Sequence, residues 1–122
     1  MTYSPSSPEL IRLNRRGLSI STFTGMEREV DLLLHELFDK NPYTRHGISI
    51  QSDDCIVDLG ANMGLFSLWC TQQAERLKIY ACEPIPPLSQ LVEENLRDQT
   101  SHQIHVEPRG VGLQPSVQTF SF

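Results

Sequence analysis

The stretch "VDLGANMG", residues 57–64, lies near the middle of the chain and decides its fold. Apolar residues with strand character at 55–59 enclose one acid, Asp58, and lead directly into a glycine-bearing turn. A helical pattern follows from about residue 64 to residue 76. We therefore predict a strand, a tight turn and a helix in succession.

The same alternation continues towards the C-terminus. A second strand is predicted at 78–82, a proline-led helix ends near Leu96, and a third strand covers 104–107. This order is the signature of parallel βαβ units, so we predict an α/β, Rossmann-like fold with a parallel sheet and flanking helices. A fourth strand is expected at 117–122, where the sequence stops, so the sheet is expected to be incomplete at the C-terminus.

The N-terminal part precedes this pattern with a different one. Residues 1–8 are polar and are expected to be a disordered lead-in. Short strands at 10–13 and 18–23 flank a turn that ends in a glycine, which predicts a β-hairpin. A capping box at 24–27 then predicts an amphipathic helix, because the Thr hydroxyl and the Glu side chain can each satisfy a free amide. Pro42 ends that helix, and 48–50 alternates as an edge strand would.

Composition limits the classes of function. The chain has 122 residues, enough for one domain with a core, and a net charge of -5 argues against binding to nucleic acid or to an anionic membrane. No apolar run approaches the roughly 18 residues of a membrane span. Three cysteines without CxxC spacing predict buried free thiols and a cytoplasmic location. They are Cys55, Cys70 and Cys82.

The turn itself offers a particular chemistry. A dinucleotide fingerprint would need its second glycine where Asn62 stands, and a P-loop would need a lysine after its glycines, so both are disfavoured. Asp58 instead lies beside Gly60 and Gly64, where a ligand can approach the backbone closely. A ligand with a positive charge and an adenosine suits such a site, and S-adenosyl-L-methionine carries both.

A second acid supports this interpretation. Glu83 lies at the end of the next predicted strand and is followed by Pro84. An acid at that place in a doubly wound fold accepts hydrogen bonds from ribose hydroxyls. The alternatives are structural, since an Asp-x-Gly is often only a turn and a Glu-Pro is often only a helix start. Because both acids lie at the ends of consecutive strands, we predict one shared binding site.

Two stretches carry a family resemblance. "YTRHGISIQSDDCIVDLGANMGLFSLWC" and "IYACEPIPPLSQLVEENL" resemble the FkbM-type S-adenosylmethionine-dependent methyltransferases, in particular those of polyketide and non-ribosomal peptide biosynthesis. The resemblance implies that residues 9–122 are a partial domain of this kind and that it methylates a hydroxyl on a small molecule, a secondary metabolite or a sugar. The cofactor-binding residues that it implies are Asp58, Gly60, Ala61, Asn62, Gly64, Glu83 and Pro84.

Other residues have weaker assignments. His46 is a candidate base for the acceptor hydroxyl and Tyr43 a candidate substrate contact, whereas the alternative is that both only pack and cap their loop. Arg109 and Gly110 either line an adenine pocket or form a plain turn. No histidine pair has metal-ligand spacing, so no metal is expected.

Two classes of function remain open at this point. The chain is an S-adenosyl-L-methionine-dependent O-methyltransferase acting on a small-molecule acceptor, or it is a truncated, inactive cofactor-binding or docking module. Domains of the resembled family continue through further strands, so the isolated chain is expected to be inactive. A homodimer or a larger biosynthetic assembly is the expected partner.

Overall fold

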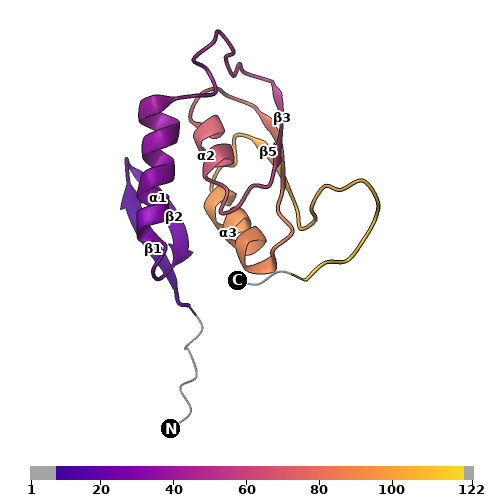
Figure 1. Ribbon diagram of the computed structural model, residues 1–122. Helices are drawn as coiled ribbons and strands as arrows, with labels where there is room; N and C mark the ends of the chain where they lie inside the picture. The colour runs from indigo at the N-terminus through magenta and orange to yellow at the C-terminus, as the bar shows by residue number, and fades with distance from the viewer. Residues whose placement is uncertain (1–7, 120–122) are drawn as a thin grey trace.

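The computed structural model describes residues 8–119, which form an antiparallel hairpin, a parallel sheet and the helices between them (Figure 1). The hairpin and the first helical segment comprise β1 (Leu10–Arg15), β2 (Leu18–Phe23), α1 (Glu27–Leu34) and its π-helical continuation η1 (His35–Lys40). The sheet and its helices are β3 (Cys55–Leu59), α2 (Leu65–Thr71), β4 (Lys78–Cys82), α3 (Pro86–Leu96) and β5 (Gln103–Glu107). The predicted hairpin and helix, and the predicted alternation of strand, helix, strand, helix and strand from residue 55 onward, are thereby confirmed.

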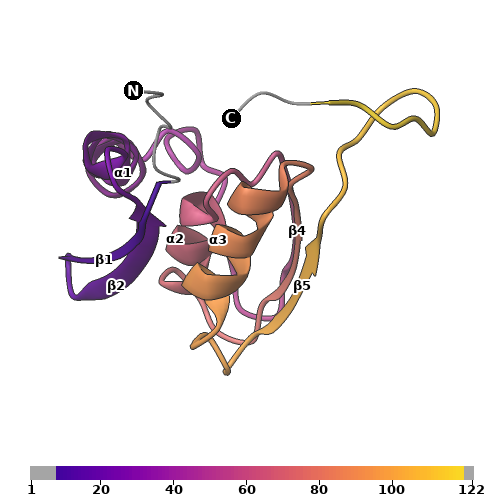
Figure 2. The ribbon, with the colours of Figure 1, turned by 90° about the horizontal axis from the view of Figure 1, so that it is seen from below.

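The three-stranded sheet is parallel, with the order β3-β4-β5. Figure 2 shows α2 and α3 between this sheet and the N-terminal hairpin, so the helices form a middle layer. In β4, Ile79 and Ala81 are fully buried towards the helices, whereas Tyr80 between them is exposed on the other face. This mixed α/β arrangement is consistent with a fragment of a Rossmann-like fold.

The core lies between the sheet and the hairpin. Its largest fully buried side chains are Trp69, Ile20, Met63, Leu77, Ile79 and Leu91. Each such side chain stabilises the fold by about 1.5–3 kcal/mol. Because Ile20 comes from β2 and Met63 from the glycine turn, hairpin and sheet share one core.

The hairpin forms as predicted, but the capping box does not. Arg16 and Gly17 have φ of 54° and 76°, the pair of positive values that a tight two-residue hairpin turn requires. The Thr24 hydroxyl donates to the Glu9 carbonyl at 3.1 Å instead of capping the helix, although the Glu27 carboxylate accepts the Gly25 N–H at 2.8 Å. The cap position of α1 is therefore Met26.

One predicted helix end and one predicted strand are wrong. The helix at 64–76 ends at Thr71, because Gln72 and Gln73 donate to carbonyls three residues back and Arg76 takes a left-handed φ of 54°. The segment 48–50 forms no strand: it follows Gly47, whose φ is 85°, and Ile48 is largely exposed.

The described part of the expected fourth strand, 117–119, is not a strand. Residues 117–119 belong to the irregular segment that follows Pro108, and Val117 is fully exposed without a neighbouring strand to pair with in the described chain. The remainder of that prediction, 120–122, and most of the expected lead-in, 1–7, lie outside the described residues.

The expectation of buried thiols holds for one cysteine. Cys70 in α2 is buried, and burial raises the pKa of its thiol to about 12. Cys82 is half-buried, and Cys55 is exposed because it points to the uncovered face of β3. No helix formed by residues 8–119 has the length and apolar character needed to cross a membrane.

Candidate functional site

The predicted cofactor-binding residues come together where β3 and β4 end. Leu59 is paired with Cys82 in the parallel register, so the two strands finish at the same level. The N–H groups of Gly60 and Ala61 both donate to the Cys82 carbonyl at 2.9 Å. The glycine turn is thereby fixed to the end of the neighbouring strand, which is the usual place of a ligand in an open α/β sheet.

Asp58 is a buried acid with one hydrogen-bond donor in the described structure. Its side chain points to the helix-covered face and is 8% exposed, and the Ser67 hydroxyl of α2 donates to Oδ2 at 2.7 Å. Burial raises the pKa of the Asp58 carboxyl; the bond from Ser67 opposes the rise, and the negative charge of Glu83 adds to it. A cation placed beside Asp58 would stabilise its charged form.

Glu83 has a different environment. It is 5% exposed, and its two oxygens accept backbone N–H groups from Asn62 at 2.8 Å and from Ile85 at 3.0 Å. The carboxylate thus joins the glycine turn to the start of α3. The structural alternative, in which Glu83 and Pro84 only begin a helix, is therefore part of the role of Glu83. Each carboxylate oxygen still has a further lone pair that can accept a hydrogen bond from a ligand hydroxyl.

The two glycines of the turn serve different purposes. Gly60 has a φ of 76°, and a Cβ built on it would meet nothing within 4 Å. Gly64 has a φ of 86°, and a Cβ there would lie 3.2 Å from the Cα of Val92 in α3. Gly64 therefore permits close helix packing, whereas the space beside Gly60 is open to a ligand. Asn62 between them is exposed and also left-handed, with a φ of 56°.

A cavity of about 880 Å³ adjoins the turn. Leu59, Gly60 and Pro84 line one side, and residues 108–118 supply most of the other. Gly110 approaches Pro84 so closely that a Cβ would lie 3.3 Å from its ring. Ligand sites usually measure about 300–1,000 Å³, so the cavity has a suitable size. Asp58 and Glu83 do not line this cavity themselves, but each directly precedes a residue that does, Leu59 and Pro84 respectively.

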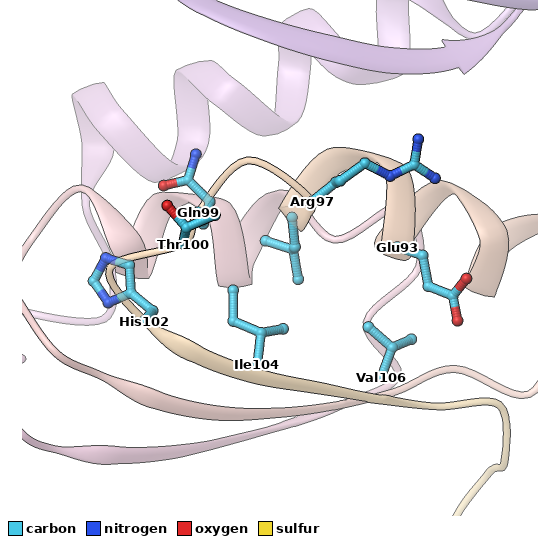
Figure 3. Close-up of a pocket in the computed structure, with 8 residues that line it drawn as sticks. Glu93, Arg97, Gln99, Thr100, His102, Ile104 and Val106 are labelled. Atoms are coloured by element: carbon cyan, nitrogen blue, oxygen red, sulfur yellow. The ribbon is translucent and has the colours of Figure 1, made fainter.

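A smaller cavity, of about 410 Å³, lies between α3 and β5 (Figure 3). Ile104 and Val106 point from β5 towards the helix, and the exposed Glu93 and Arg97 lie on the helix side. The ring of His102 accepts the Leu77 N–H at 3.0 Å, so this histidine has a structural contact. None of the predicted site residues lines this cavity.

The loop with Tyr43 and His46 precedes the amino end of β3 and lies at the top of Figure 1. Tyr43 is 53% exposed and packs on Phe66, with 4.7 Å between ring centroids, and on Trp69. These ring contacts agree with the alternative that Tyr43 packs its loop against α2. His46 is exposed in the same loop. Its action as a base and a contact of Tyr43 with an acceptor stay predictions.

Some contacts of the site could not be read from the sequence. Ser67 is one of several serines and carries no motif that assigns it to Asp58. The backbone bonds to Glu83 depend on how the turn and α3 meet in space. Within residues 8–119, no group of three His, Cys, Asp or Glu side chains is arranged to hold a metal ion.

Comparisons with known proteins point to methyltransferases. No protein-family model matches the chain. It is 34% identical over 58 residues to the 31-O-demethyl-FK506 methyltransferase FkbM of Streptomyces tacrolimicus, covering 48% of this chain and 22% of that protein. It is 33% identical over 91 residues to the methyltransferase sdnD of Sordaria araneosa, covering 75% and 33%.

A third relative belongs to another kind of protein. The chain is 34% identical over 94 residues to the AMB antimetabolite synthetase AmbE of Pseudomonas aeruginosa, covering 77% of this chain and 4% of the synthetase. The chain therefore spans a third or less of each of these curated relatives. The similarity supports a methyltransferase family at the level of the matched segment.

Proposed function

We propose that this chain binds S-adenosyl-L-methionine and forms the cofactor-binding part of a methyltransferase. The observation that carries the proposal is the pair of buried carboxylates, Asp58 and Glu83, at the ends of neighbouring parallel strands and joined to one left-handed glycine turn. Similarity to two proteins named as methyltransferases supports it independently.

Each part of the site has a proposed role. Asp58 attracts the positively charged methionine end, because its desolvated carboxyl gains from a nearby cation. The open backbone at Gly60 allows close approach, and Ala61, Asn62 and Gly64 complete the turn. Glu83 accepts the ribose hydroxyls with the lone pairs that its backbone bonds leave free.

The neighbouring cavity supplies the remaining space. Pro84, Arg109 and Gly110 are proposed to surround the adenine, and their position in the lining of the cavity next to Gly60 supports this. When bound, the cofactor supplies an activated methyl group on a sulfonium. The chain contributes alignment, exclusion of water and electrostatic stabilisation, which are the main requirements for transfer to an oxygen.

We further propose a small-molecule hydroxyl as the acceptor. The names of two relatives support this choice: one is a 31-O-demethyl-FK506 methyltransferase and the other an antimetabolite synthetase. Further polypeptide, in a homodimer or a larger biosynthetic assembly, is proposed to cover the outer sheet face, where Val57, Leu59 and Tyr80 are exposed. Activity is expected only in that larger unit.

Calorimetric titration with S-adenosylhomocysteine tests the cofactor assignment. The parent chain is expected to bind it, and Glu83→Ala is expected to weaken binding tenfold or more, since hydrogen bonds to a charged acceptor are each worth about 1.5–3 kcal/mol. Glu29→Ala on the exposed face of α1 is the matched control and should leave affinity unchanged. A folded Glu83→Ala variant with parental affinity would contradict the assignment.

A further inference from the structure

One buried side chain connects three parts of the molecule. Asn95 in α3 is 5% exposed, and its Oδ1 accepts the Ser21 N–H of β2 at 2.6 Å. Its Nδ2 donates to the Ser21 carbonyl at 3.0 Å and to the Met63 carbonyl of the glycine turn at 2.8 Å. A single side-chain amide therefore joins the helix, the hairpin and the turn. Its oxygen accepts one hydrogen bond and its NH2 group donates two, which is what an amide can do.

Other contacts hold the same point of the turn. The Thr22 hydroxyl of β2 lies 3.6 Å from the Met63 sulfur, and Gly64 packs against Val92 of α3. Residues 63 and 64 are thus held by β2 and by α3. Left-handed residues such as Asn62 cost free energy and persist only where their surroundings fix them. The surroundings here include the N-terminal hairpin.

We propose that Asn95 is a positioning residue for the cofactor site, and that through it the hairpin β1–β2 sets the geometry of the glycine turn. The inference rests on the proposed function. The connection is continuous: Asn95 fixes the Met63 carbonyl, the turn presents the Asn62 N–H, and that group binds Glu83 Oε1 at 2.8 Å. Removing the side-chain amide of Asn95 is expected to disturb the orientation of Glu83, although the two side chains are connected only through the glycine turn.

Ligand binding separates this role from ordinary packing. Asn95→Ala leaves the Met63 carbonyl and both Ser21 groups without their partner, and it should weaken S-adenosylhomocysteine binding at least fivefold while the chain stays folded. The matched control is Ile20→Val, which trims a fully buried hairpin side chain and should leave affinity unchanged. Parental affinity in Asn95→Ala, or equal weakening in both variants, would overturn the inference.

A conservative variant gives a second test. In Asn95→Asp the side chain keeps an acceptor for the Ser21 N–H, but its ionised form has no donor for the Met63 carbonyl. Affinity should fall as in Asn95→Ala at neutral pH and recover in part as the new acid is protonated. An affinity of Asn95→Asp that matches the parent at neutral pH would contradict a role of the donated bond.

Hydrogen exchange tests the connection without a ligand. In the parent chain, the Ser21 and Gly64 amides should exchange in one opening event, with the same dependence on denaturant. The measurement needs no variant to fold. If Gly64 stays protected when Ser21 exchanges, the proposed connection is wrong. If the amides are coupled but S-adenosylhomocysteine does not bind, the ligand assignment fails and the positioning of the turn by Asn95 stands.

Discussion

The two ends of the glycine turn differ in how completely the protein surrounds them. At the first end, the Asp58 carboxylate accepts a hydrogen bond from the Ser67 hydroxyl, and Gly60 has free space beside it. At the second end, Gly64 contacts Val92 and the preceding carbonyl is held by Asn95. The difference teaches that the first end is available to a ligand, whereas the second end is part of the scaffold.

Substitution of the two glycines tests this comparison most directly. Gly64→Ala is expected to lower the free energy of unfolding by about 2–5 kcal/mol, because left-handed strain and a contact with the backbone of Val92 add together. Gly60→Ala should cost only about 1–2 kcal/mol, the left-handed penalty alone. Urea denaturation of both variants measures the difference. Equal losses would show that both ends are equally packed.

Glu83 lies between the two ends, and its removal should affect both stability and binding. Glu83→Ala leaves the N–H groups of Asn62 and Ile85 without their acceptor, at a cost of about 1–3 kcal/mol each. Glu83→Gln keeps an acceptor oxygen and should lose about half as much. Thermal unfolding of the two variants measures this, and an Ala variant as stable as the Gln variant would remove the scaffold role.

At the open end, the loss of the Ser67 hydroxyl that donates to Asp58 should have a milder effect. Ser67→Ala removes the bond to Asp58 Oδ2 and is expected to cost about 1.5–3 kcal/mol at neutral pH, since the acceptor is charged. The cost should shrink in acid, where Asp58 is protonated. Denaturation at two pH values measures both effects, and a cost that does not depend on pH would mean that Asp58 is neutral throughout.

The smallest effect concerns the charge of Asp58 itself. The pKa of Asp58 is raised in the folded chain by burial, so the folded state holds the proton more tightly than the unfolded state does. Ionisation of the carboxyl therefore lowers stability as the pH rises above the ordinary pKa of an aspartate. Asp58→Asn cannot ionise, so the variant should gain stability relative to the parent between acid and neutral pH. Parallel pH series of unfolding measure this gain. A constant difference between the two chains would contradict the raised pKa.

The regular part of the fold could be predicted from the sequence because its signals are local. The pattern of apolar residues predicts β3, β4 and α3. Because parallel strands end at the same edge of a sheet, the same pattern also predicts that Asp58 and Glu83 lie close together. The irregular segments were not predictable in this way. The segment 48–50 alternates like a strand but has no neighbouring strand to pair with in the described chain.

The partners of the site residues were also beyond sequence reasoning. Asn95 is far from both of its partners along the chain, 74 residues from Ser21 and 32 from Met63. Such contacts depend on how the layers pack and leave no local pattern. The different roles of Gly60 and Gly64 likewise follow from what lies beside each, which the sequence alone does not contain.

The uneven burial of the cysteines has a practical consequence. Cys55 is exposed at the start of β3, on the sheet face that also presents Val57 and Leu59, whereas Cys70 is buried with a thiol pKa of about 12. Thiolate is the reactive form, so alkylating reagents should modify Cys55 far faster than Cys70. The wild-type chain therefore carries a natural labelling position, and slower alkylation of Cys55 in a larger assembly would show that a partner covers this face.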